Sequence, residues 1–136
     1  MKTLVIFYSY SGHTKAFAEK LAADESTSIV EIKDIKRPGK LKAYTVGCLA
    51  AIRGKAWPIQ PLDAVLADYD RLILFAPIWA SNPPPAFNAM LELLPKGKIV
   101  AVKMVSVSGQ SKCKERLDAI IKSKNGTLES FEDVKA

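Results

Sequence analysis

Residues 3–17 read TLVIFYSYSGHTKAF, and the fold can be predicted outward from this segment. Its first part, residues 3–8, is an uninterrupted apolar run, which is typical of a parallel strand buried on both faces. Its last part opens a segment, residues 12–23, whose apolar residues recur at helical spacing, with Phe17 and Leu21 expected to lead the buried side. A buried strand, a short polar loop and a helix in this order predict the first unit of a parallel α/β sheet.

The same alternation continues along the rest of the chain. Further strands are expected over residues 28–32, 71–77, 98–107 and 127–134, and further helices over 41–53, 86–94 and 111–122. A short helical turn is expected within residues 62–69, and Pro and Gly residues mark loops at 54–61 and 78–85. Five strands joined by short helical crossovers predict one domain over residues 1–136, a doubly wound parallel sheet of order 2-1-3-4-5 in which the apolar first, third and fourth strands are central.

Composition narrows the class of protein. The chain is 49% hydrophobic and 25% charged, as in globular domains, and we expect a cytoplasmic protein because neither a membrane span nor a signal peptide is recognisable. The net charge is +6, but Lys and Arg are scattered and form no nucleic-acid motif, so we expect neither a nucleic acid nor a membrane as partner. Cys48 and Cys113 have neither zinc-site nor CxxC spacing, which predicts two reduced thiols and no metal site.

The loop between the first strand and the first helix is rich in small hydrogen-bonding groups. Ser9, Ser11 and Thr14 carry hydroxyls, Gly12 allows close approach of the backbone, and His13 adds a ring N–H. A helix N-terminus binds anions through free N–H groups and the helix dipole, and no Lys completes a Walker motif here. The loop therefore predicts an anion held by neutral dipoles; the alternative is that Ser9 or Ser11 merely caps the helix.

The loop after the third strand reads APIWASNPPP, residues 76–85. In the strand order 2-1-3-4-5, ligands bind beyond the carboxyl ends of strands one and three, where the chain reverses direction. The loop places the flat ring of Trp79 beside Ser81 and Asn82, and three prolines stiffen it. The two loops together predict a ligand with a phosphate at one end and an aromatic ring at the other, unless Trp79 is an ordinary core residue.

These two loops resemble those of flavodoxin-like proteins. YSYSGHT resembles their FMN-phosphate loop, APIWASNPPPAF resembles the loop that lies against the isoalloxazine ring, and DYDRLILFAPIW has the spacing of the third strand in short bacterial members of the family. The resemblance implies FMN as cofactor. It implies that the FMN phosphate is bound by a first group of residues, namely Ser9, Tyr10, Ser11, Gly12, His13 and Thr14. It implies that the ring is bound by a second group, namely Pro77, Ile78, Trp79, Ala80, Ser81 and Asn82.

A third loop, SVSGQSKC at residues 106–113, completes the pocket implied by the resemblance. The backbone N–H groups of Ser108, Gly109 and Gln110 would face the flavin carbonyls, although an ordinary strand-to-helix turn is the alternative. This loop lacks the aromatic residue that flavodoxins commonly place there. Ala80 stands where flavodoxins often have Gly, and we expect it to resist a positive φ.

The sequence also lacks the C-terminal fifth helix of flavodoxins, because it stops at the fifth strand. Right-handed crossovers would leave one face of the sheet covered by the first helix alone. We expect an apolar patch over strands three to five, and hence a homodimer that covers it.

The resemblance implies an FMN-binding redox protein that transfers electrons to a redox partner protein or a small acceptor. We expect an electron carrier rather than an NAD(P)H-dependent oxidoreductase, and no residue stands out as a general acid or base, so no catalytic residue is predicted. Two alternatives stay open: an FMN-dependent NAD(P)H:quinone-type reductase, and a flavin-free interaction module.

Overall fold

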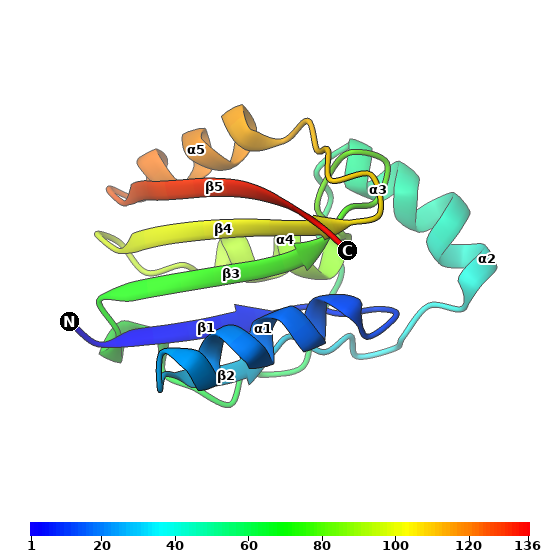
Figure 1. Cartoon of the computed structure of the whole chain (residues 1–136). Helices are drawn as coiled ribbons and strands as arrows, with labels where there is room; N and C mark the ends of the chain where they lie inside the picture. Colours follow the sequence, from blue (N-terminus) through cyan, green and yellow to red (C-terminus); the bar gives the residue numbers. More distant parts are fainter.

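Five parallel strands form one sheet of order β2-β1-β3-β4-β5 in the computed structural model, which describes every residue from Met1 to Ala136 (Figure 1). The strands are β1 (Thr3–Phe7), β2 (Ser28–Glu31), β3 (Arg71–Pro77), β4 (Ile99–Ser106) and β5 (Thr127–Lys135). The α/β class and the strand order are as predicted. The three most apolar strands are central because parallel strands are buried on both faces.

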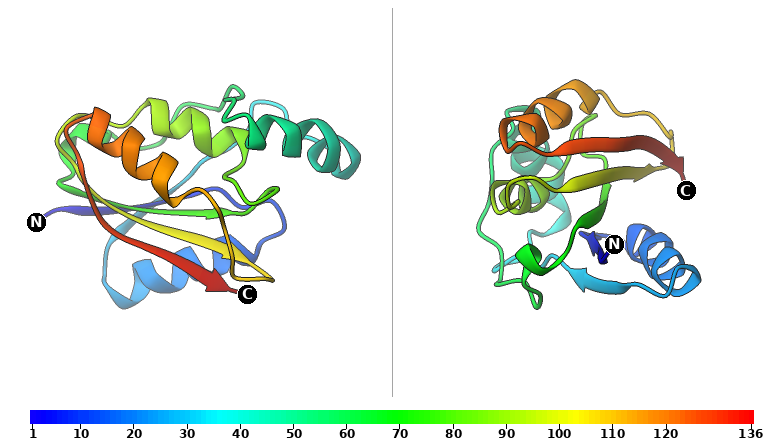
Figure 2. Two further views of the ribbon diagram at one scale, coloured as in Figure 1. Left: turned by 90° about the horizontal axis from the view of Figure 1, so that it is seen from above. Right: turned by 90° about the vertical axis from the view of Figure 1, so that its left-hand side faces the viewer.

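Helices cover the two faces unequally. Only α1 (His13–Asp24) lies on one face, while the others lie on the opposite face (Figure 2): α4 (Pro85–Glu92), α5 (Lys114–Ser123), and a continuous helical segment made of α2 (Lys40–Lys42), the π-helix η1 (Ala43–Gly47) and α3 (Cys48–Ile52). This is the arrangement that right-handed crossovers require. A 3₁₀ turn, η2 (Leu66–Asp68), precedes β3. None of these helices combines the length and the apolar character that crossing a membrane needs.

The core has two parts. The larger one lies between the sheet and α4 and α5, around Phe87, Met90 and Leu117. The smaller one lies under α1, which faces the sheet with Ala18 and Ala22. The expectation that Phe17 and Leu21 lead this side was wrong: Phe17 is exposed and Leu21 only partly buried. The strands already supply large side chains on this face, so small residues let the helix approach closely.

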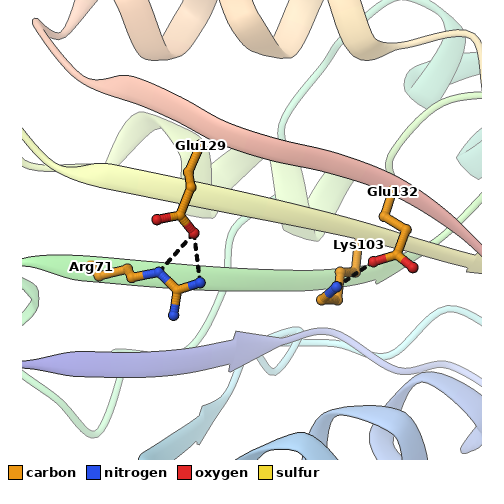
Figure 3. Close-up of polar contacts among 4 residues, drawn as sticks. All are labelled: Arg71, Lys103, Glu129 and Glu132. Atoms are coloured by element: carbon orange, nitrogen blue, oxygen red, sulfur yellow. Dashed lines mark hydrogen bonds and ion pairs between the residues drawn. The ribbon is translucent and has the colours of Figure 1, made fainter.

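The sheet face beyond α1 is covered by two ion pairs rather than left apolar (Figure 3). Arg71 on β3 donates from Nε and Nη2 to Glu129 Oε1 on β5, at 2.8 and 2.6 Å, and Lys103 on β4 pairs with Glu132. The aliphatic stems of Arg71 and Lys103 cover apolar surface while their charged ends reach the acids of β5.

The expected apolar patch over strands three to five is therefore absent. The side chains that would have formed it are buried, namely Ile73, Phe75, Ala101 and Val105. β5 is the last element of the described residues. The homodimer stays a prediction, now without the apolar patch that motivated it.

The segment α2–η1–α3 is fastened to the body at its C-terminal end. The buried Asn88 on α4 donates to the carbonyl of Lys55 at 2.9 Å and accepts from Arg116 Nη2 on α5 at 3.2 Å. Arg116 also donates to the carbonyl of Ala51 at 3.4 Å. This small polar network holds α3 in place, and the N-terminal end of the segment projects beyond the sheet (Figures 1 and 2).

Candidate functional site

The N-terminus of α1 is open. Gly12 is its N-cap residue, with a φ of 101° that favours Gly, and no side chain caps the first turn. Ser9 Oγ instead accepts the N–H of Gly12 at 3.0 Å, one position before the helix. The alternative that Ser9 or Ser11 caps the helix was therefore wrong. The N–H groups of the first turn have no protein partner and remain free for an anion.

The side chains around this turn are neutral donors. Ser11 is exposed, and its Oγ lies 3.4 Å from Nδ1 of the exposed His13. Thr14 is buried at the base of the same turn. No Lys or Arg is among the residues that line the cavity beside it, so a bound anion would be held mainly by dipoles, as the sequence predicts.

Three loops meet in one cavity of about 230 Å³ at the carboxyl edge of the sheet. The loop after β1 contributes four residues that were predicted from the sequence, the loop after β3 contributes three, and the end of β4 adds a third wall. The lining is Tyr10, Ser11, His13, Thr14, Pro77, Ile78, Trp79, Val105, Ser106, Val107 and Ala136. The first two predicted loops thus lie side by side, because β1 and β3 are neighbours with matched register.

A second, more apolar cavity of about 430 Å³ adjoins the first. It shares Tyr10, Ile78 and Trp79 with it and extends to the helical segment. Its remaining lining is Lys40, Ala43, Tyr44, Cys48 and Ala80. Ligand sites typically enclose about 300–1,000 Å³, so the two adjoining hollows together are large enough for a mononucleotide.

Trp79 forms the wall between the two cavities. Its ring lies edge-on to Tyr8, with ring centroids 6.2 Å apart, and to Tyr10, at 5.6 Å. A Cβ at Gly47 would lie 2.8 Å from Trp79 Cζ3, so the helix can pack against this ring only where it has a glycine. Trp79 is partly buried against the core and lines both cavities, and its contact with a ligand stays a prediction.

Tyr10 is held in place by the loop that follows β2. Its hydroxyl donates to the carbonyl of Pro38 at 2.8 Å, and Arg37 Nη2 donates to the carbonyl of Tyr10 at 2.8 Å. The Arg37 guanidinium also lies over the Tyr10 ring, 4.1 Å from its centroid. Arg37 was not predicted as a site residue, because the residues after β2 form no recognisable motif.

Tyr8 ties the same loop to the sheet. Its hydroxyl donates to Asp34 Oδ2 at 2.5 Å. Burial, reinforced by this bond and by the carboxylate charge, raises the pKa of Tyr8 far above its usual range. Burial also raises the pKa of Asp34, while the hydrogen bond from Tyr8 and the charge of Arg37 act in the opposite direction. Tyr8 is thus a fixed neutral donor at one edge of Trp79.

The loop after β3 contains a tight turn in a strained conformation. Trp79 and Asn82 exchange two backbone hydrogen bonds, at 2.7 and 3.1 Å, and the residues between them have φ values of 50° (Ala80) and 68° (Ser81). This is a type I′ turn without the usual Gly or Asn, and each left-handed residue costs about 1–2 kcal/mol. The expectation that Ala80 would resist a positive φ was wrong, because the paired hydrogen bonds impose it.

Only part of this loop lines the two cavities. Ala80 lines the apolar cavity, whereas Ser81 and Asn82 line neither. The carbonyl of Ser81 accepts the N–H of Lys112 at 2.8 Å, which ties this loop to the loop after β4. Contact of Ser81 and Asn82 with a ligand stays a prediction.

In the loop after β4, backbone N–H groups donate to serine hydroxyls of the same loop. The N–H of Gly109 donates to Ser106 Oγ at 2.9 Å, and the N–H of Gln110 donates to Ser108 Oγ at 3.3 Å. Val105, Ser106 and Val107 line the smaller cavity, whereas Ser108, Gly109 and Gln110 do not. A ligand role for these three residues stays a prediction that requires the loop to rearrange.

Both thiols are unpaired, as the sequence predicts. Cys113 is buried and Cys48 partly buried beside the apolar cavity, and burial raises the pKa of each. Neither is therefore a reactive thiolate at neutral pH. No cluster of His, Cys, Asp and Glu side chains is arranged to hold a metal ion.

Comparison with known proteins agrees with this architecture. No family model and no curated protein matches the sequence. A solved flavoprotein from Lactobacillus acidophilus NCFM, in complex with FMN, superposes with a TM-score of 0.78 at 22% identity, over 96% of this chain and 91% of that chain.

The fold is flavodoxin-like. Flavodoxin 2 from Bacillus cereus matches this flavodoxin-like chain with a TM-score of 0.57 at 20% identity, over 100% of this chain and 86% of its own. An NADPH-quinone reductase from P. pentosaceus matches with a TM-score of 0.60 at 12% identity, over 99% of this chain and 85% of that chain.

Proposed function

We propose that this flavodoxin-like protein binds FMN and transfers electrons. The observation that carries the proposal is the meeting, in one cavity, of an uncapped helix N-terminus and a tryptophan wall. The first suits a phosphate and the second suits a planar ring, so the site fits both ends of FMN. Two unpaired cysteines agree with a cytoplasmic location, which we include in the proposal.

The phosphate end would be bound by neutral donors. The free N–H groups of the α1 first turn point along the helix axis, and the exposed hydroxyl of Ser11 and ring of His13 lie beside them. The dipole of a 12-residue helix favours negative charge at this end. Ser9 Oγ accepts the N–H of Gly12, and its own hydroxyl proton stays free to donate, so contact of Ser9 with the phosphate stays a prediction.

The ring end would be bound by a rigid wall. Trp79 is fixed on three sides, by Tyr8, Tyr10 and Gly47, and therefore loses little side-chain freedom when a ring stacks on it. Bound FMN would supply the redox chemistry, as flavins do in other proteins. The basic groups near this edge, Arg37 and Lys40, favour a negatively charged ligand electrostatically.

One observation favours the second candidate, a reductase for a small acceptor. The loop after β4, residues 106–113, has no aromatic side chain that could cover the second face of a bound flavin, so this face would stay open to a small acceptor. Steady-state turnover with NADPH and a quinone would separate a reductase from a carrier. A flavin-free interaction module remains the third candidate, and it requires that FMN does not bind.

A comparison of FMN with riboflavin tests the proposal, because the two ligands differ only by the phosphate. We expect calorimetry to give an FMN Kd below about 10 µM and at least about tenfold weaker riboflavin binding. Gly12→Ala should weaken FMN binding about tenfold and leave riboflavin unchanged, because it strains the turn that presents the N–H groups. Gly39→Ala is the matched control, since a Cβ there meets nothing within 4 Å and its φ is −67°. Absence of FMN binding, or equal affinity for the two ligands, would refute the proposal.

A further inference from the structure

The outer side of the α2–η1–α3 segment is an apolar ridge, which we define as Leu41, Tyr44, Val46, Leu49 and Ile52. These side chains are 47–79% exposed. Residues 43–52 contain no charged side chain, and the inner side of the helix is apolar too, with Ala43, Gly47, Ala50 and Ala51 buried against the body. A helix that is apolar all round is normally covered on all sides, and this one is covered on only one.

The excess positive charge of the protein falls within the stretch of sequence that contains this ridge. Residues 33–55 contain seven Lys and Arg residues and a single acid, Asp34, which makes a net charge of +6. The rest of the chain contains 13 Lys and Arg and 13 Asp and Glu, and is neutral. The seven cations are all exposed, and none belongs to an ion pair.

This distribution indicates what could cover the ridge. A second copy of the chain would bring another +6 to the same place, so like-charge repulsion disfavours a homodimer through this surface. The occupant should instead be anionic, with an apolar layer that can accept five side chains.

Shape favours a lipid surface over an acidic protein. The N-terminal end of the helical segment projects beyond the sheet (Figures 1 and 2). Tyr44 lines the apolar cavity, whereas the other four ridge residues do not line it. A protein partner would need a groove of matching shape, whereas a fluid bilayer adapts to an exposed helix. Lys40 and Lys42 lie at one end of the uncharged run and Arg53 and Lys55 at the other, where lipid headgroups would meet them.

We propose that residues 33–55 form a docking surface for anionic phospholipid membranes. The helix lies along the membrane plane, the ridge enters the headgroup–acyl boundary, and the flanking cations contact lipid phosphates. This differs from our expectation that no membrane partner exists, because the charge appeared scattered until acidic residues were counted along with basic ones. Since Tyr44 belongs to both the ridge and the lining of the apolar cavity, docking brings that cavity to the membrane surface.

Vesicle sedimentation of the purified full chain tests this inference without added flavin, so its result is independent of FMN binding. We expect at least about tenfold stronger partition to vesicles with about 30% phosphatidylglycerol than to pure phosphatidylcholine, and loss of most binding at about 0.5 M salt. Lys40→Glu/Lys42→Glu should reduce partition at least about tenfold, and Leu41→Ser/Leu49→Ser at least about fivefold.

The matched control is Lys20→Glu/Lys96→Glu, which changes the net charge equally at exposed positions outside the docking surface. It should reduce partition less than about threefold. Circular dichroism melting curves would confirm that every variant is folded. The inference is overturned if the wild-type protein does not bind anionic vesicles. It is also overturned if the control double variant lowers the partition as much as the Lys40→Glu/Lys42→Glu variant does. The first result would leave an acidic protein as the occupant, and the second would indicate only general charge attraction.

Discussion

Replacing Gly47 by alanine is the sharpest test of how the aromatic wall is built. A Cβ at this position would lie 2.8 Å from Trp79 Cζ3 and 3.2 Å from Cε3. Ordinary carbon contacts are about 3.5–4.0 Å, so the ring must retreat by about 0.7 Å or more. Its other contacts leave little room for this, because Tyr8 and Tyr10 already meet the ring edge-on.

Two opposing free energies set the size of the effect. Overpacking of this kind costs about 1–3 kcal/mol. Alanine in place of glycine inside a helix recovers about 1 kcal/mol. We therefore expect the free energy of unfolding of Gly47→Ala to fall by about 1 kcal/mol, which lowers the Tm by about 3–5 °C for a domain of this size.

The assay uses a Trp57→Phe background, in which Trp79 is the single tryptophan. Urea denaturation gives the change in stability, and near-ultraviolet circular dichroism reports the packing of the Trp79 ring. Gly39→Ala serves again as control, because a Cβ there has no neighbour within 4 Å. If Gly47→Ala raises the stability by about 1 kcal/mol, as at an unobstructed helix position, and leaves the Trp79 signal unchanged, the packing argument is wrong.

Four further predictions concern other parts of the fold. Asn88→Ala should lower the free energy of unfolding by about 2–3 kcal/mol in urea titrations, because it removes the bonds to Lys55 and Arg116 in a buried network; a loss under about 0.5 kcal/mol would contradict this. Lys103→Ala should uncover part of the sheet face and so increase its binding of a hydrophobic dye. Lys103→Met keeps the aliphatic stem, so it should change dye binding little and lower the free energy of unfolding by less than about 1 kcal/mol. In wild type, the raised pKa of Tyr8 means that the folded state keeps this proton longer than the unfolded state, so stability should fall as the pH rises above about 10, and Tyr8→Phe should remove that loss. Carbon NMR titration of Tyr8→Phe should also show the Asp34 pKa moving further up, since the lost hydrogen bond was lowering it, and an unchanged or lower value would argue against the Tyr8–Asp34 bond.

Local sequence patterns were enough to predict the order of the elements and the class of the sheet. The uninterrupted apolar strands can only be buried on both faces, and right-handed crossovers then leave one arrangement of helices. For the same reason, the meeting of the loops after β1 and β3 could be predicted, because neighbouring parallel strands end at one edge.

The shape of those loops depends largely on contacts between residues that are far apart in the chain. The positive φ of Ala80 is imposed by hydrogen bonds between Trp79 and Asn82, and the glycine at position 47 has its reason in a ring 32 positions further along the chain. The cover of the sheet by Arg71, Lys103 and their acidic partners on β5 likewise depends on contacts between distant strands. Local patterns report hydrophobic period and turn chemistry, but they do not report which distant side chain fills the space beside a residue, or whether an apolar helix keeps one side uncovered.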